Sequence, residues 1–113
     1  MKKEIRAIIK EPKKSAFVKT IPNTLESLQN LVGGYIQCIS LGQKNGKPIL
    51  AICNEEGKLM GLPNNIPIGY DVLCGTVVIV GDAGEDFGDC PLTLDEFKAC
   101  LPKLQQSGMI SIG

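Results

Sequence analysis

Residues 24–37, TLESLQNLVGGYIQ, join a helix to a strand and so decide the class of fold. The apolar residues of this stretch recur at spacings of three and four: Leu25, Leu28, Leu31 and Val32. This period predicts a helix with one apolar stripe, which must pack on a sheet or on another helix. Gly33 and Gly34 end the helix, because its C-terminal cap commonly takes a left-handed conformation that glycine adopts without strain.

The segment before this helix predicts a β-hairpin. Residues 4–10 are rich in isoleucine, residues 11–14 (EPKK) are typical of a turn, and residues 16–21 supply a second strand. Pro22 stops that strand. Asn23 is the expected N-cap of the helix, with Glu26 three residues later completing a pair that resembles a capping box.

The segment after the helix predicts further strands. Residues 35–41 and 48–53 form a second hairpin, because the polar segment between them contains Asn45-Gly46, a pair favoured in tight turns. Residues 59–62 predict a short strand, and residues 63–74, with two prolines and two adjacent asparagines, predict a loop. Residues 75–80, GTVVIV, are continuously apolar, which predicts the central strand of the sheet.

A second helix is expected near the end of the chain, because Thr93 and Glu96 have the spacing of a capping box. Its apolar stripe follows: Leu94, Phe97, Leu101 and Leu104. Pro102 is expected to kink or end this helix. Residues 109–112 are apolar enough to form an edge strand or to contact a partner.

These elements predict an α+β fold: a mixed or mostly antiparallel sheet of about five strands with two helices packed on one face. The length of 113 residues suits a single domain over residues 1–113. Twelve basic and twelve acidic side chains cancel, which disfavours generic nucleic-acid binding. No apolar run approaches the roughly 20 residues that span a bilayer, so no membrane contact is expected.

Five cysteines occur without CxxC spacing: Cys38, Cys53, Cys74, Cys90 and Cys100. They are expected to be buried thiols, since three of them lie in apolar runs. The N-terminal sequence MKKEIRAIIKEPKK does not have the pattern of a signal peptide. The expectation is therefore a cytoplasmic protein with reduced thiols.

The sequence contains no histidine, which removes the usual general base and the commonest metal ligand. It also lacks the GxSxG and SxxK motifs of serine nucleophiles and the glycine-rich loops that bind nucleotide phosphates. These features predict a protein that is not an enzyme and that uses no cofactor.

An acidic, glycine-rich loop follows the predicted central strand. Its carboxylates are weak metal-ligand candidates: Asp82, Glu85, Asp86 and Asp89. Clustered oxygen ligands can hold calcium or magnesium, but the spacing does not match an EF-hand. The same acids would also stabilise the start of the second helix through its dipole, so no metal site is predicted.

A second polar cluster contains the candidate ligand-binding residues: Asn54, Glu55, Asn64 and Asn65, together with Tyr35. Asparagine and glutamate in turns usually bond to their own backbone. If this segment folds back on itself, however, its polar groups would flank a groove where a ligand could bind.

Three stretches resemble a known family: residues 24–37, residues 53–65 (CNEEGKLMGLPNN) and residues 75–87 (GTVVIVGDAGEDF). In this order they resemble domain-of-unknown-function family 3846, which occurs in bacteria and often in their phages and mobile elements. The resemblance implies a compact α+β domain with a role in mobile-element biology. It supplies no catalytic residues.

The sequence therefore favours a small accessory protein that binds a protein partner, with a homodimer through an edge strand or the apolar residues 109–112 as a further option. The alternative is a domain that binds or sequesters a small anionic, nucleotide-like ligand, using the cations of the first hairpin. A second alternative is a metal-dependent hydrolase built on Asp82, Glu85 and Asp86.

Overall fold

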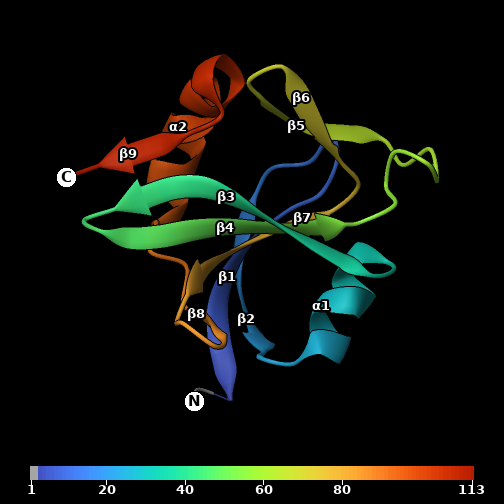
Figure 1. Cartoon of the computed structure of the whole chain (residues 1–113), viewed down its shortest axis with the longest axis horizontal. Helices are drawn as coiled ribbons and strands as arrows, with labels where there is room; N and C mark the ends of the chain where they lie inside the picture. The colour runs from blue at the N-terminus through green and yellow to red at the C-terminus, as the bar shows by residue number, and fades with distance from the viewer. Residues whose placement is uncertain (1–2) are drawn as a thin grey trace.

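The structure, a computed structural model, describes residues 3–113 (Figure 1). It contains two helices, α1 (Leu25–Val32) and α2 (Leu94–Ser107). Its strands, in chain order, are β1 (Glu4–Lys10), β2 (Phe17–Pro22), β3 (Ile36–Lys44), β4 (Lys47–Asn54), β5 (Asn64–Ile68), β6 (Asp71–Cys74), β7 (Val77–Asp82), β8 (Phe87–Gly88) and β9 (Ile110–Ile112). Neither helix within the described residues is long and apolar enough to cross a membrane.

Seven strands form the main sheet, in the order β2-β1-β7-β4-β3-β9, with β8 paired to β7. All pairs are antiparallel except β3 with β9, which are parallel. The predicted α+β class with a mostly antiparallel sheet is therefore confirmed. The sheet is larger than the expected five strands, partly because the short strands β8 and β9 extend it.

Strand β7 lies at the centre of this sheet, as its apolar sequence predicts. It pairs with β1 on one side and with β4 on the other. Residues 77–81 are all buried. A strand covered on both faces needs apolar side chains at every position, which explains the continuous run.

The two helices cover opposite faces of the sheet. Successive strand residues point to opposite faces, and the core is divided in the same way. In β7, Ile79 packs in the same cluster as Phe97 of α2, whereas Val78 packs in the cluster that contains Leu28 of α1. The prediction of both helices on one face is therefore wrong, because an apolar stripe does not specify which face of a sheet it covers.

The ends of both helices are capped. Thr24, and not the predicted Asn23, is the N-cap of α1, and its hydroxyl accepts a hydrogen bond from the Ser27 backbone N–H. Asn23 instead donates to the Asp86 carboxylate and to the Phe87 carbonyl, each at 3.0 Å. The Asn23 side chain therefore ties the start of α1 to the acidic loop.

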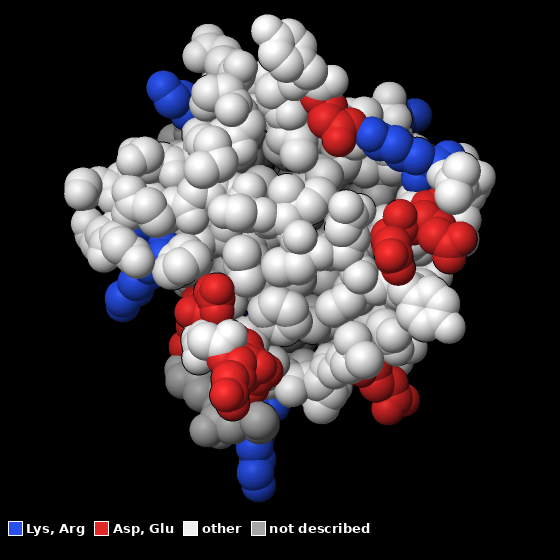
Figure 2. Space-filling model, viewed as in Figure 1, with Lys and Arg blue, Asp and Glu red and all other residues white. Residues whose placement is uncertain are grey.

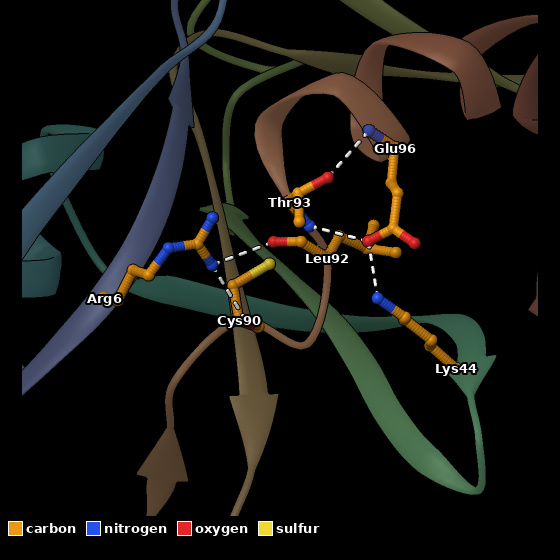
Figure 3. A network of polar contacts seen from close by, with 6 residues as sticks. All are labelled: Arg6, Lys44, Cys90, Leu92, Thr93 and Glu96. Atoms are coloured by element: carbon orange, nitrogen blue, oxygen red, sulfur yellow. Dashed lines mark hydrogen bonds and ion pairs between the residues drawn. The ribbon is translucent and has the colours of Figure 1, made fainter.

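Helix α2 begins with the predicted capping box of Thr93 and Glu96. Pro102 does not end the helix, which continues to Ser107. Figure 3 shows how its start is held: Arg6 Nη1 of β1 donates to the Cys90 carbonyl at 3.0 Å and to the Leu92 carbonyl at 2.8 Å. This network fixes α2 against the main sheet.

Two segments differ from the sequence predictions. Residues 63–74, expected to be a loop, contain the hairpin of β5 and β6, whose Ile66 and Leu73 are buried in the same cluster as Phe97. Residues 59–62, expected to be a strand, lie in a series of turns. These turns are closed by local hydrogen bonds, such as the bond from the Met60 N–H to the Glu56 carbonyl.

The β3–β4 hairpin has the predicted Asn45-Gly46 turn, with positive φ at both residues as a type I′ turn requires. A register shift follows Ser40, and at Gly42 the strand meets β9. A Cβ at Gly42 would lie 1.9 Å from the Ile110 carbonyl oxygen. Only glycine lets β9 approach β3 this closely.

Candidate functional site

The outer edge of β3 is open along most of its length. Strand β3 pairs with β4 along its whole length, but on its other side β9 covers only residues 42–44. No other described strand pairs with residues 36–41, and these residues (IQCISL) carry no charge. We call residues 36–41 the open edge.

Backbone groups at alternate positions of the open edge face away from β4. The Tyr35 carbonyl accepts from the Glu55 N–H, so residues 35, 37 and 39 direct their backbone groups toward β4. By the alternation of an antiparallel pair, the N–H and C=O groups of Ile36, Cys38 and Ser40 point outward. Of the five cysteines predicted to be buried, Cys53, Cys74 and Cys90 are buried, Cys100 is half-buried and Cys38 is exposed.

A pocket of about 250 Å³ lies beside the open edge, between β3 and β6, and we call it the edge pocket. Its lining includes Gln37 and Ile39 of β3 together with Val72 and Leu73 of β6. Lys58 and Asp71 also line it and form an ion pair, in which the hydrogen bond from Lys58 lowers the pKa of the Asp71 carboxyl.

Cys53 and Cys74 also line the edge pocket, and burial raises the pKa of the Cys53 thiol. The thiol is therefore held in its neutral form at physiological pH. With the Cys53 thiol neutral and Lys58 paired to Asp71, Glu55 is the one charged residue of the lining that forms no ion pair with another described residue.

A second pocket, of about 470 Å³, lies at the end of α1, and we call it the helix-end pocket. It is lined by Gln29, Asn30, Gly33, Gly34, Tyr35, Asn54, Glu56 and Met60. Tyr35 is 68% exposed and Met60 56% exposed, and the neighbouring Leu59 of the edge pocket is 87% exposed. Large apolar side chains exposed together are common at binding surfaces.

The structure brings some of the predicted ligand-binding residues together and separates others. Asn54 lines both pockets, with Tyr35 in the helix-end pocket and Glu55 in the edge pocket. Asn65 lines neither pocket: its amide donates to the Lys10 and Gly75 carbonyls, at 2.7 and 2.8 Å. Asn64 is exposed and likewise lies outside both pockets.

Asn54 is 5% exposed, and both ends of its amide are bonded. Its Oδ1 accepts from the Glu56 N–H at 2.8 Å, and its Nδ2 donates to the Val32 carbonyl at 3.2 Å. Asn54 therefore shapes the wall between the two pockets.

The acidic loop does not gather its carboxylates around one point. Asp82 accepts from the Gly84 N–H, Asp86 from the Phe87 N–H, and Asp89 from the Arg6 N–H, each at 2.8–2.9 Å. Within residues 3–113, no group of three or more potential ligands could hold a metal ion, so Glu85 and its neighbours do not form one. Asp82 and Asp86 therefore hold the turn before β8, and Asp89 binds the backbone of β1.

The sequence prediction missed the open edge as a functional feature. The signal was available, because YIQCISLG (35–42) has strand character and no charge, whereas natural edge strands are usually protected by charge or proline. What the sequence did not specify is that β9 covers so little of β3. Figure 2, viewed as in Figure 1, shows that the centre of the face crossed by β3 is uncharged and that charged side chains lie around it.

The fold and this surface define a small α+β domain with an open sheet edge and two adjoining pockets, and comparison places it in a family. The family model described as "Domain of unknown function (DUF3846)" matches residues 5–101, so the chain belongs to this family. The matched range contains the open edge and both pockets. No curated protein and no solved structure gives a significant match.

Proposed function

We propose that this protein acts by binding a protein partner, as a cytoplasmic accessory protein of a bacterial phage or mobile element, without catalysis of its own. One observation carries the proposal: an uncharged open edge is bordered by the exposed apolar side chains Tyr35, Leu59 and Met60. Burying the exposed apolar surface of these side chains would stabilise a complex by roughly 25 cal/mol per Å².

The chemistry of the described residues supports binding over turnover. The chain has no histidine, and the carboxylates of Asp82, Asp86 and Asp89 are engaged by backbone N–H groups. The metal-dependent hydrolase, the second alternative, would need Asp82, Glu85 and Asp86 to converge on one ion, and within residues 3–113 no group of three potential ligands does so. A protein interface needs only complementary surface, which the open edge and its apolar border provide.

The test is affinity capture from a lysate of the bacterium that encodes the protein. The baits are the wild type, the triple variant Tyr35→Ser/Leu59→Ser/Met60→Ser, and Tyr70→Ser, which removes an exposed tyrosine outside both pockets. Circular dichroism establishes that each bait is folded. We expect a partner that wild type and Tyr70→Ser retain and that the triple variant loses at least tenfold. Failure to enrich any protein, or equal capture by the triple variant, would contradict the proposal.

A small-ligand function is the second candidate, and the volume of the helix-end pocket favours it. The described lining has one carboxylate, Glu56, and no cation, which suits a neutral or cationic ligand better than an anionic one. Thermal shift separates the candidates, with neutral nucleosides and cationic amines tested beside the anionic nucleotides and signalling dinucleotides. A ligand at 100 times its Kd should add about 2.7 kcal/mol of stability, and no shift would leave protein binding as the better proposal.

A further inference from the structure

We infer that the open edge of β3 binds an extended segment of the partner as an added β-strand, whose alternate side chains enter the edge pocket. This inference rests on the proposed protein-binding function and specifies its mode. Strand addition combines main-chain hydrogen bonds with side-chain pockets at every second residue. Both components are present at this edge.

The hydrogen-bonding component is the set of outward backbone groups at Ile36, Cys38 and Ser40. Each residue offers one donor and one acceptor, and no described strand uses them. Strand β9 already adds to the same edge at residues 42–44, so the geometry of the edge accepts a further strand. An extended segment beside residues 36–40 would continue the line of β9.

The side-chain component is the edge pocket. Gln37 and Ile39 point from β3 to the face of the sheet that carries this pocket. In a strand paired with β3, every second side chain points to that same face. The pocket volume of about 250 Å³ is below the roughly 300–1,000 Å³ typical of drug-sized ligands, so it suits single side chains.

The apolar walls of the edge pocket and its Glu55 carboxylate identify the chemistry of the segment. Lys58 and Asp71 neutralise each other at the pocket, and the rest of its β3 and β6 lining includes Ile39, Val72 and Leu73. Aliphatic side chains at alternate positions complement this lining, whereas an acidic side chain would lose its hydration beside the Glu55 carboxylate without gaining a partner. The segment is therefore extended, apolar at every second residue and without acidic side chains at the edge pocket.

A second copy of this chain fits the edge less well than a free segment. Antiparallel pairing about a two-fold axis at Cys38 would place residue 34 of the copy opposite Gly42. Ile110 already occupies that position, and its carbonyl oxygen lies within 1.9 Å of where a Gly42 Cβ would be. A segment that ends or turns before Gly42 avoids this collision.

The main test uses Cys38→Pro, which removes an outward N–H and leaves the β3–β4 hydrogen bonds in place. Proline is tolerated at an edge where its nitrogen faces solvent. The matched control is Cys38→Ala, which removes the thiol and keeps the N–H. The probe is a random dodecapeptide library displayed on phage and selected on the wild-type chain. Leu59→Glu, at an 87% exposed position of the edge pocket, is a second variant that does not depend on the backbone change.

We expect the selected peptides to alternate apolar residues and to bind wild type and Cys38→Ala equally. Binding to Cys38→Pro and Leu59→Glu should be at least tenfold weaker. Hydrogen exchange on the wild type gives an internal comparison. Bound peptide should slow exchange at the outward amides of Ile36, Cys38 and Ser40, while the inward amides of Gln37 and Ile39 stay protected throughout.

Several outcomes would overturn the inference: no selected peptide, equal binding to Cys38→Pro and Cys38→Ala, unchanged exchange at the outward amides, or a homodimer that buries the open edge. If Cys38→Pro does not fold, Leu59→Glu and hydrogen exchange decide the matter. A lysate partner captured equally by wild type and Cys38→Pro would leave the protein-binding function standing and reject strand addition alone.

Discussion

Asn54 and Asn65 illustrate, at the residue scale, how polar side chains are used to join segments. The Asn54 amide connects the end of α1 to the turn after β4, and the Asn65 amide connects β5 to the Lys10 and Gly75 carbonyls. Asparagine is typical of turns, so the sequence predicted irregular structure at both positions. The bond between Asn54 and the Glu56 N–H is local, as expected for a turn, but the sequence did not reveal Val32 and Lys10 as partners, because they lie far away in the chain.

Replacing Asn54 with alanine should lower the free energy of unfolding by about 1–3 kcal/mol, because the buried Val32 carbonyl loses its donor. Urea unfolding followed by far-UV circular dichroism measures the change. Asn64→Ala, at an exposed position, is the control and should change little. Equal effects of the two substitutions would show that the Asn54 hydrogen bonds do not stabilise the fold.

Gly42→Ala should destabilise the protein more than Gly46→Ala. Both glycines have positive φ, but a Cβ at Gly46 meets nothing within 4 Å, whereas a Cβ at Gly42 collides with Ile110. Gly46→Ala should therefore introduce backbone strain alone, which lowers the free energy of unfolding by more than about 0.4–1 kcal/mol. Thermal unfolding midpoints compare the two variants. A smaller effect at Gly42 would mean that β9 does not pack against β3 as described.

At the scale of elements, local signals predicted structure well where a segment's own neighbours stabilise it. The capping box of Thr93 and Glu96 and the Asn45-Gly46 turn depend on residues within a few positions, and both were predicted correctly. The β5–β6 hairpin was missed, because its prolines and asparagines are typical of loops. Burial of Ile66 and Leu73 in the cluster that contains Phe97 stabilises it, and that contact is not encoded locally.

Glu96 provides a pH-dependent test of the start of α2. Its hydrogen bond with Lys44 Nζ, at 2.6 Å, lowers the pKa of the Glu96 carboxyl below its ordinary value of 4.5, and the Thr93 backbone N–H adds to the effect. The folded state therefore favours the charged carboxylate. Its contribution to stability is complete above pH 4.5 and is lost as the pH falls through the lowered pKa.

Glu96→Gln should therefore reduce the urea midpoint at pH 7, with a difference from wild type that shrinks as the pH falls well below 4.5. Glutamine keeps the capping hydrogen bond with Thr93 and removes only the charge. Glu26→Gln, in the first turn of α1, is the matched control. A Glu96→Gln difference that stays constant down to acid pH would rule out the ion pair with Lys44 as its source.

At the scale of the whole molecule, one sheet is shared by two apolar clusters. The sequence predicted the α+β class and the central strand, because amphipathic periods and a continuous apolar run are visible in it. It did not predict that α1 and α2 lie on opposite faces or that β9 covers only residues 42–44. Both features depend on contacts between segments distant in sequence.

Because β7 contributes to both clusters, a destabilising substitution in either cluster should lower the free energy of unfolding of the whole domain. The domain should still unfold in a single transition. Phe97→Ala, on the α2 face, should lower the free energy of unfolding by about 3–5 kcal/mol, and Leu28→Ala, on the α1 face, by about 2–5 kcal/mol. Urea unfolding is followed in parallel by circular dichroism and tyrosine fluorescence. Leu59→Ala, at an exposed position, is the control. Separate transitions for the two probes would show that the faces unfold independently.

The central position of β7 also has a kinetic consequence. The β1–β2 ribbon and the β3–β4 ribbon are joined within the sheet only through β7. An isolated two-stranded ribbon is marginally stable in water, so neither ribbon is stable before β7 pairs with it. Ile8 must find Ile79 across most of the polypeptide, and closing so long a loop is entropically costly. The rate of refolding should therefore be limited by the insertion of β7 between the β1–β2 ribbon and the β3–β4 ribbon.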